Sequence, residues 1–590
     1  MHNCLTVPFD ELLSKGFKTR QTDIRPANSI NTAFQLIAVL FQIQSLQQFG
    51  GVASSHIDWT MVPYVRKSFY KHFTKKYILS EMKKENVDFK HSKDFSEYCK
   101  LKRKEFNEKY GIEDEKFVIG DFSMDCVNFH VGDEKLMNIN KDWYDEALIS
   151  TTEELRQAVE GMYHNLNSLQ SRSGNQLPFT SVNYGTCTLP EGRMVIKALL
   201  EGSINGVGEH HLTPIFPCGI FQCMKGVNRK EGEPNYDLFK LALESTSQRI
   251  YPNYVNVDWS VNAGYDPNNP RTYTATMGCR TYNGYDINGF GQMKDGRGNL
   301  APVTIILPTL AMEAKEMLEG KEFTKEELVN KFMKVLDKKI HEAKDMLLER
   351  FERMCSQSPK AASFMWLNGT MFGYDEKEGP ISALRHGTLA VGELGLAETL
   401  NILIGKDQTT EEGMALAKEI EGLFKKRCTE FKKQYSLNFG VYYTPAENLC
   451  YTAFKKFKNK YGDIEGVTYY IKKDDNGNET RKDKEYFTNS IHVPVYKEMS
   501  PFDKIDIESQ LTSFSNAGCI TYVELPSGTK NNIEGLETIV NYAMDKDIPY
   551  FAINVPIDEC HDCGYTDEMG DTCPECGSHN VQHLRRVTGR

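Results

Sequence analysis

Short apolar runs separated by longer amphipathic segments characterise the chain from residue 179 onward. Runs of this length predict buried strands, and their alternation with helical patterns favours parallel strands joined by crossover helices. We therefore expect an α/β architecture. The runs expected to form strands are residues 179–184, 194–199, 213–221, 303–307 and 440–443.

The N-terminal part of the chain has helical periodicity instead. Apolar residues recur at three- and four-residue spacing between residues 30 and 70, with a break at Gly50 and Gly51. Residues 83–115 are highly charged, and we expect a solvated helical insertion there rather than core.

Two later segments also predict helices, and a third predicts a turn. Residues 325–354 follow a plausible N-cap at Thr324, and residues 410–431 repeat the pattern after Thr409. Residues 472–484 contain Asp-Asp-Asn-Gly-Asn, a composition that predicts a loop or hairpin tip.

Bulk composition narrows the class of protein. A 590-residue chain with 40% hydrophobic residues can bury a substantial core. Its net charge of −11 argues against a general nucleic-acid or membrane-surface binder. The apolar runs are far shorter than the roughly 20 residues of a membrane span, and no signal peptide pattern opens the chain. Fifteen cysteines are too sparse for a disulfide framework, so we expect reduced thiols in a cytoplasm.

Four cysteines near the C-terminus form two close Cys-x-x-Cys pairs, each followed directly by glycine. Such knuckles are typical of a tetrahedral Zn²⁺ site, and four thiolates leave no open position for chemistry, so the metal would be structural. A redox-active pair or a nucleic-acid-binding zinc ribbon is the alternative, although the nine-residue gap is shorter than usual ribbon spacing. The four expected ligands are Cys560, Cys563, Cys573 and Cys576.

A Gly/Asn/Tyr-rich segment between residues 262 and 291 carries Cys279 within the string Met-Gly-Cys-Arg. This composition predicts a loop with a permissive backbone. An isolated cysteine is usually an ordinary buried residue. At the tip of a loop inside a barrel it could instead hold a transient thiyl radical. Asp-Gly-Arg-Gly-Asn-Leu follows at residues 295–300.

The string Thr-Pro-Ala-Glu-Asn-Leu-Cys at residues 444–450 predicts a turn and a helix start. Free N–H groups at such a start can bind an anion, for which a triphosphate is a natural guest. A purely structural helix start, with Glu447 favourable in its first turn, fits the local chemistry about as well. His492, taken alone, is more typical of a satisfied core residue than of a catalyst.

In this order, the strings resemble those of the anaerobic (class III) ribonucleotide reductases, which are glycyl-radical enzymes. The zinc knuckles followed by Val-Thr-Gly resemble the C-terminal radical loop, and Met-Gly-Cys-Arg resembles the cysteine finger. Cys4 matches the second active-site cysteine on the first barrel strand, although a floppy terminus is the alternative interpretation. The implied fold is a ten-stranded α/β barrel of two five-stranded parallel halves around a central finger loop, with a small C-terminal zinc-binding segment.

The resemblance also implies a division of the chain. Residues 1–555 would form the barrel, residues 556–580 the zinc-binding segment and residues 581–590 the glycyl radical tail. Family members usually carry a further N-terminal region and continue beyond Val-Thr-Gly. We therefore expect this chain to be shortened at both ends, with a truncated tail.

The implied reaction is anaerobic reduction of ribonucleoside triphosphates to deoxyribonucleoside triphosphates for DNA synthesis. Gly589 would store the radical, because its Cα carries no side chain and can flatten. Cys279 would receive the radical and abstract the ribose 3′-hydrogen, and Cys4 would deliver hydrogen as the 2′-hydroxyl leaves as water. Asn299 and Met277 match positions of members that use formate as the reductant; thioredoxin-like reduction is the alternative.

Further residues and partners are implied in the same way. A homodimer is expected, with dNTP or ATP effectors, no membrane contact and no direct nucleic-acid binding. A separate radical-SAM activating enzyme would generate the radical, with S-adenosylmethionine and a [4Fe–4S] cluster held on that partner. Substrate binding is assigned to Thr444, Ala446, Glu447, Asn448 and His492.

Three other functions remain open at this point. Another glycyl-radical enzyme, such as a lyase, is one; such chains usually lack the knuckles and the set of Cys4, Cys279 and Asn299. A catalytically impaired or split reductase subunit that needs a separate piece is the second. The third is a zinc-ribbon binding protein without catalysis, against which the acidic charge and the large α/β body count.

Overall fold

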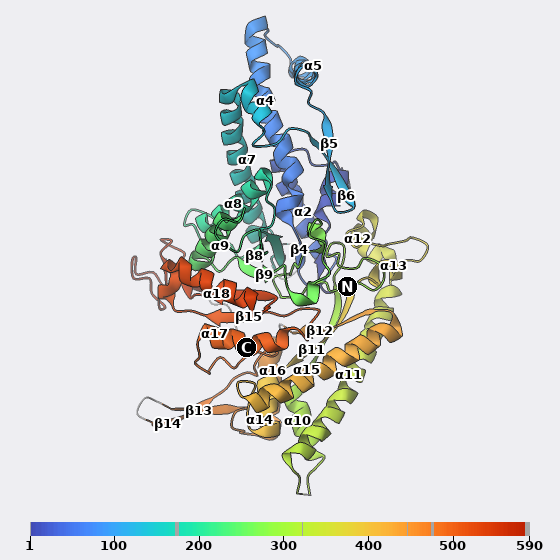
Figure 1. The fold of residues 1–590 in the computed structure, drawn as a ribbon, viewed down its shortest axis with the longest axis vertical. Helices are drawn as coiled ribbons and strands as arrows, with labels where there is room; N and C mark the ends of the chain where they lie inside the picture. The colour runs from blue at the N-terminus through green and yellow to red at the C-terminus, as the bar shows by residue number, and fades with distance from the viewer. Residues whose placement is uncertain (1, 171–175, 321, 445–446, 474–476, 585–590) are drawn as a thin grey trace.

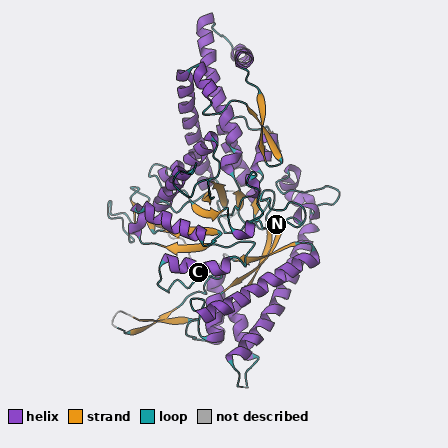
Figure 2. Ribbon diagram, in the orientation of Figure 1, coloured by secondary structure: helices purple, strands orange, loops and turns teal. Residues whose placement is uncertain are grey.

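The computed structural model describes the chain apart from residues 1, 171–175, 321, 445–446, 474–476 and 585–590. Two sheets occupy the middle of the molecule, and helices cover their outer sides (Figure 1). A long helical projection extends from one end, and a second group of helices forms the other end (Figure 2). No helix within the described ranges combines the length and the apolar character needed to cross a membrane.

The larger sheet has seven strands. Its first five run parallel to their neighbours, the sixth is antiparallel to the fifth, and the seventh is parallel to the sixth. Every residue of the first five strands is buried, as expected of parallel strands covered on both faces. In sheet order the strands are β1 (Leu5–Thr6), β4 (Val52–Ser54), β7 (Thr180–Tyr184), β8 (Cys218–Cys223), β9 (Asn253–Asn256), β16 (Tyr550–Asn554) and β15 (Thr521–Glu524).

The smaller sheet is fully parallel and consists of β10 (Asn299–Ile306), β11 (Thr388–Leu394) and β12 (Asn438–Tyr443). Isolated bridges connect its two outer strands to the larger sheet. An antiparallel bridge joins Thr6 of β1 to Arg297, two residues before β10, and a parallel bridge joins Tyr442 of β12 to Gly518, three residues before β15. Each edge of the smaller sheet therefore lies beside an edge of the larger one.

The helices of the described chain vary from single turns to the long α11. They are α1 (Phe9–Lys15), α2 (Ile30–Ser45), α3 (Ile57–Thr60), α4 (Val62–Glu85), α5 (Ser92–Tyr110), α6 (Glu134–Ile139), α7 (Lys141–Ser168), α8 (Pro190–Asn205), α9 (Tyr236–Gln248), α10 (Leu307–Glu316), α11 (Lys325–Cys355), α12 (Ser363–Asn368), α13 (Ile381–Leu384), α14 (Leu396–Ile404), α15 (Glu411–Tyr435), α16 (Glu447–Tyr461), α17 (Pro501–Thr512) and α18 (Ile533–Asp545).

Small antiparallel pairings complete the fold. One of them, in the C-terminal segment, has three strands with β17 at its centre. The strands are β2 (Phe17–Lys18) with β3 (Asp23–Ile24), β5 (Asp114–Ile119) with β6 (Phe122–Val127), β13 (Tyr469–Lys473) with β14 (Glu479–Asp483), and β17 (Ile557–Cys560) with β18 (Thr566–Asp567) and β19 (Val581–Leu584).

The projection formed by α4, α5 and α7 has a hydrophobic core of its own (Figure 1). Phe73 and Phe106 are fully buried in it, with Tyr144 beside them. Residues 83–115, expected as a solvated insertion, cover the end of α4, all of α5 and the start of β5. Because α5 buries Cys99, Lys102 and Phe106, its charged residues form only one face of a packed helix.

Most of the expected strands are present, with one clear error. Residues 179–184, 303–307 and 440–443 correspond to β7, β10 and β12, whereas the run at 213–221 becomes a strand only at Cys218. The expected strand at residues 194–199 is wrong, because this run lies inside α8. Pro190 opens that helix, and its buried apolar residues recur at helical spacing: Val195, Ile196, Leu199 and Leu200.

The two expected long helices are confirmed as α11 and α15. Thr324 forms a full capping box with Glu327 at the start of α11. The cap of α15 is Thr410 rather than Thr409, because the Thr410 hydroxyl accepts the amide of Gly413 at 3.1 Å. The polar stretch 472–484 contributes to the β13–β14 hairpin, whose tip lies outside the described residues.

Candidate functional site

Two cysteines from distant parts of the chain meet at the centre of the molecule. Cys4 directly precedes β1, and its Sγ lies 3.9 Å from Sγ of Cys279. Cys279 sits in a tight turn in which the amide of Arg280 donates to Met277 O and that of Met277 to Thr281 O, both at 2.8 Å. The turn places Arg280 in the left-handed region, at φ 73°. The loop predicted from composition therefore presents one thiol to the other.

The thiol pair touches both sheets. Cys4 and Met277 are buried together with Ala53 of β4, and half-buried Cys279 packs against them. Cys279 Sγ lies 3.4 Å from the Thr281 hydroxyl, which lies 2.9 Å from the hydroxyl of Tyr442 on β12. Neither Thr281 nor Tyr442 carried a signal in the sequence, because their role depends on the position of the turn between the sheets.

Asn299, the first residue of β10, is the immediate neighbour of Cys4. Its carbonyl accepts the amides of Asn3 and Cys4, both at 3.0 Å. Its side chain is fully buried, and within the described structure neither Oδ1 nor Nδ2 has a hydrogen-bond partner. Buried polar atoms are almost always paired, so this amide is suited to a small polar ligand.

The two thiols differ in acidity because one donates to the other. The hydrogen bond with Cys4, opposed by burial and aided by Thr281, lowers the pKa of Cys279 to about 6. The same hydrogen bond, together with burial, raises the pKa of Cys4 well above its ordinary value. The contact between the two sulfurs therefore makes Cys279 the more acidic thiol of the pair.

The segment after β12 brings further predicted residues to the finger. Thr444 follows β12, and its hydroxyl lies 3.0 Å from that of Thr304 on β10. The α16 helix begins at Glu447, whose carboxylate lies 3.7 Å from the Arg280 guanidinium, and Asn448 is exposed. The start of α16 therefore faces the cysteine turn.

His492 reaches the same region through aromatic and polar contacts. It is buried, and its Nδ1 lies 3.2 Å from Glu508 Oε2. Burial lowers its pKa against the opposing effect of Glu508. Its ring centroid is 5.7 Å from that of Tyr522, whose hydroxyl accepts from Arg280 at 3.1 Å. His492 Nε2 is buried without a partner among the described atoms.

Two predicted residues cannot be placed. Ala446 and Gly589 both lie outside the described residues, as does Pro445. Their roles therefore rest on the sequence.

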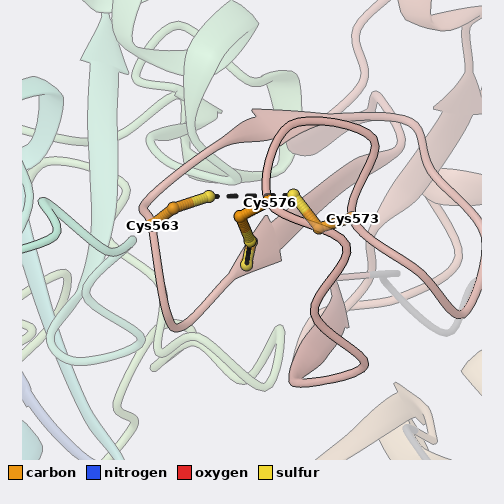
Figure 3. Close-up of side chains that lie close together, drawn as sticks. Cys563, Cys573 and Cys576 are labelled. Carbon is orange, nitrogen blue, oxygen red and sulfur yellow. Dashed lines mark hydrogen bonds between the residues drawn. The ribbon is translucent and has the colours of Figure 1, made fainter.

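The four C-terminal cysteines form a cluster of the kind that binds zinc. Sγ of Cys560 lies 3.6 Å from that of Cys576, and Sγ of Cys563 lies 3.7 Å from that of Cys573. All four sulfurs lie within 4.8 Å of one another, and Figure 3 shows three of the side chains converging. A tetrahedral ion with Zn–S bonds of about 2.3 Å needs sulfurs roughly 3.8 Å apart, so the donor set fits Zn²⁺.

Each Cys-x-x-Cys knuckle closes on a glycine whose backbone is left-handed, a conformation that favours glycine. Gly564 (φ 77°) donates to Cys560 O at 2.9 Å, and Gly577 (φ 72°) donates to Cys573 O at 3.0 Å. Burial opposes ionisation of Cys560, but nearby amides and thiols lower its pKa to about 7. Since β17 pairs with β19, the cysteine cluster holds the strand that leads to residues 585–590.

A buried charged group beside β1 was missed in the sequence. His56 Nε2 lies 2.7 Å from Asp10 Oδ2, its Nδ1 contacts Ser55 at 2.6 Å, and Asp295 lies 3.9 Å away. Burial alone would lower the pKa of His56, but the two aspartates raise it to about 9. Both ring nitrogens of His56 therefore have hydrogen-bond partners. Arg271 lies 3.7 Å from Asp295. His56 and Arg271 thus both lie beside the buried carboxylate of Asp295.

Comparisons with known proteins agree over almost the whole chain. The family model described as "Anaerobic ribonucleoside-triphosphate reductase" matches residues 1–589. The chain is 30% identical over 607 residues to the anaerobic ribonucleoside-triphosphate reductase of Haemophilus influenzae, covering 100% of this chain and 72% of that protein. It is 29% identical to the Enterobacteria phage T4 reductase, covering 99% of this chain and 82% of that protein.

Solved structures support the same fold. The Thermotoga maritima anaerobic ribonucleotide reductase in complex with dATP and CTP matches with a TM-score of 0.62 at 15% identity, covering 100% of this chain and 80% of that one. The same enzyme with dATP bound in the specificity site gives 0.61 at 16% identity, covering 100% and 81%. The mixed α/β fold described above is therefore like that of these structures.

Proposed function

This chain belongs to the anaerobic (class III) ribonucleoside-triphosphate reductase family and is an oxidoreductase, and we propose that it reduces its substrate through a thiyl radical on Cys279, with formate as the reductant. The observation that carries the proposal is the 3.9 Å contact of Cys279 and Cys4 beside the amide of Asn299, which has no partner among the described residues. Fold alone would not specify the chemistry.

The two thiols divide the hydrogen transfers between them. Gly589 stores the radical and passes it to Cys279, whose thiyl abstracts the hydrogen from ribose C3′. Cys4 supplies hydrogen at C2′ as the 2′-hydroxyl leaves as water, and Cys279 returns its hydrogen to C3′. Contact between the sulfurs supports this scheme, because both can face one ribose without rearrangement of the fold.

Formate would supply the two electrons and leave as carbon dioxide. The buried side-chain amide N–H of Asn299 has no hydrogen-bond partner in the described structure and can donate to a carboxylate. Met277 is buried against Cys4, so its sulfur borders the same space. A thioredoxin-like reductant would need a pair of thiols that a partner protein can reach, whereas Cys4 is only 2% exposed.

Substrate binding is proposed at the end of β12 and the start of α16. We propose that Thr444, Ala446, Glu447, Asn448 and His492 bind the ribonucleoside triphosphate, whose phosphates would meet the N-terminal amides of α16. The Thermotoga maritima reductase binds CTP and dATP. By analogy, this chain would take a ribonucleoside triphosphate as substrate and dNTP or ATP as effectors, and it would act as a homodimer.

The ten strands of the two sheets would form one closed α/β barrel, with five parallel strands in each half and the Cys279 turn at its centre. Support comes from the two bridges at the sheet edges. Within this division residues 1–555 form the barrel, 556–580 the zinc segment and 581–590 the radical tail. Zn²⁺ on Cys560, Cys563, Cys573 and Cys576 would be structural.

The activation step needs a partner that supplies radical chemistry. A radical-SAM enzyme with its own [4Fe–4S] cluster and S-adenosylmethionine would generate the glycyl radical. The test is anaerobic incubation with that activase, S-adenosylmethionine and a reductant, followed by EPR spectroscopy. We expect a glycyl doublet that is lost in Gly589→Ala, and deoxyribonucleotide formation that depends on formate. Zinc-loaded, folded protein without a doublet would contradict the proposal and favour a split or impaired subunit.

A further inference from the structure

A buried carboxylate connects the zinc segment to the main body of the protein. Glu559 precedes the zinc ligand Cys560 in β17 and is only 1% exposed. Its Oε1 accepts the amide of Thr213 at 2.9 Å and also the Thr213 hydroxyl. The Arg249 guanidinium donates to the same oxygen at 3.4 Å. Glu559 is thus held by a residue pair that lies more than 300 positions earlier in the chain.

Arg249 is itself fixed by the helices around it. Its Nε and Nη2 donate to the carbonyl of Ile204 in α8 at 3.1 and 2.7 Å, and it caps the end of α9. Its Nη1 donates to the Thr213 hydroxyl at 3.2 Å. Removal of one partner from a buried ion pair of this kind is strongly destabilising, because the other charge is left uncompensated.

The segment that contains Thr213 leads to Cys218, which lies beside the cysteine turn. Five residues after Thr213 the chain reaches Cys218 at the start of β8. A Cβ at Gly278, next to Cys279, would lie 2.8 Å from Cys218 Sγ and 2.9 Å from Phe179 Cε1. The Phe179 ring in turn packs on that of Phe216, with centroids 5.2 Å apart. A packed series of residues thus runs from Glu559 to the finger.

We propose that Glu559 is a positioning residue for radical transfer. Its bonds to Thr213 and Arg249 seat the zinc segment, as far as β19, at a fixed place relative to Cys279. The inference rests on the proposed function, since it assigns Glu559 to the step between Gly589 and Cys279. Hydrogen transfer between two groups is steeply sensitive to their separation, and a misplacement of about 1 Å can cost on the order of 100-fold in rate.

The test compares Glu559→Gln with Glu191→Gln in the full, zinc-loaded chain. The first keeps the shape of the side chain and removes its charge. The second removes the charge of another buried ion pair, in which Arg66 Nε donates to Glu191 at 3.1 Å, on elements that carry no zinc ligand. Four quantities are measured: zinc per chain, hydrogen exchange of residues 557–584, glycyl spins per chain and turnover per spin.

We expect Glu559→Gln to retain zinc, to exchange the amides of β19 faster and to lose roughly 10-fold or more in turnover per spin. Glu191→Gln should leave zinc, exchange in the zinc segment and turnover per spin unchanged. Unchanged exchange and unchanged turnover per spin in Glu559→Gln would overturn the proposal. An equal loss of turnover per spin in Glu191→Gln would do the same, because it would show a general effect of lost stability.

A milder variant covers the case in which Glu559→Gln does not fold or loses its zinc. Thr213→Val removes only the hydroxyl that donates to Glu559, and we expect faster β19 exchange with slower turnover per spin. No change in either would overturn the proposal. Absence of a doublet from the unsubstituted chain would refute the proposed function instead, and the exchange comparison would then decide the anchoring role of Glu559 by itself.

Discussion

The sulfurs of Cys4 and Cys279 lie 3.9 Å apart although 275 positions separate the two residues. Cys4, just before β1, is held by the hydrogen bond from its amide to the carbonyl of Asn299. Cys279 is held by the turn that the hydrogen bond from the Arg280 amide to Met277 O closes. Backbone hydrogen bonds therefore fix both sides of the contact. A pair held in this way can face one ribose without a large motion of the backbone.

Replacement of either thiol should abolish nucleotide reduction while the fold persists. We expect Cys279→Ala and Cys4→Ala to form no measurable deoxyribonucleotide, and the double variant to be no worse than either single one, because the two thiols act as a unit. Each change should cost only about 1 kcal/mol of stability, as for loss of a small buried group. Product is measured by anaerobic chromatography, and turnover in Cys279→Ala would refute the thiyl mechanism.

Asn299 should contribute to activity and not to stability. Since neither side-chain polar atom has a partner in the described structure, Asn299→Leu should leave the melting temperature equal or higher while turnover is lost. Asn183→Leu is the matched control, because that buried amide donates to Ser54 O at 2.9 Å and Thr276 O at 2.8 Å. It should lose about 1–3 kcal/mol. Equal destabilisation of both variants, measured by thermal unfolding, would contradict the assignment.

Local sequence patterns predicted the parts of this fold that depend on local chemistry. The cap at Thr324 and the strand at residues 303–307 follow from capping and from an apolar run, and both are confirmed. The run at residues 194–199 was misassigned because a short apolar segment has no strong period of its own. Its helical state follows from the ten other positions of α8, Pro190 among them, which lie outside this short run.

Contacts between distant segments could not be predicted in this way. His56, Asp10 and Asp295 come from three separate parts of the chain, and none of them stands in a recognisable spacing. Glu559 likewise looks like an ordinary strand residue until Thr213 and Arg249 are placed beside it. Such residues become visible only once the topology has brought their partners together.

Gly278 should be intolerant of any side chain. A Cβ there would lie 2.8 Å from Cys218 Sγ and 2.9 Å from the Phe179 ring, so the cysteine turn would have to move. We expect Gly278→Ala to lower turnover by about 10- to 100-fold and stability by roughly 1–3 kcal/mol. Gly161→Ala in α7 is the control, because nothing lies within 4 Å of its added methyl group, and helix propensity should make it neutral or slightly stabilising. Full activity of Gly278→Ala in a steady-state assay would refute the close packing.

Stability should fall at alkaline pH because of His56. Its pKa is raised to about 9 in the folded protein from 6.5 when unfolded, so the folded state binds the proton more tightly. The resulting stability is fully present below about pH 6.5 and is lost as pH rises through about 9, on the order of 3 kcal/mol in total. Denaturant unfolding across this range measures the slope. His56→Gln should flatten it. An unchanged slope in His56→Gln would show that other groups cause it.

Loss of zinc should disable the C-terminal segment and spare the rest of the fold. Cys563 is exposed, so Cys563→Ser removes a ligand without opening a cavity in the core. We expect zinc content to fall, the β17–β19 pairing to lose its exchange protection and the glycyl doublet to disappear, while the main unfolding transition stays in place. Cys355→Ser, at a half-buried cysteine of α11 outside the four-cysteine cluster, should keep zinc and doublet alike. Zinc content is measured by metal analysis and the radical by EPR spectroscopy. A full doublet from a zinc-free chain would contradict the prediction, because the radical would then form without the metal.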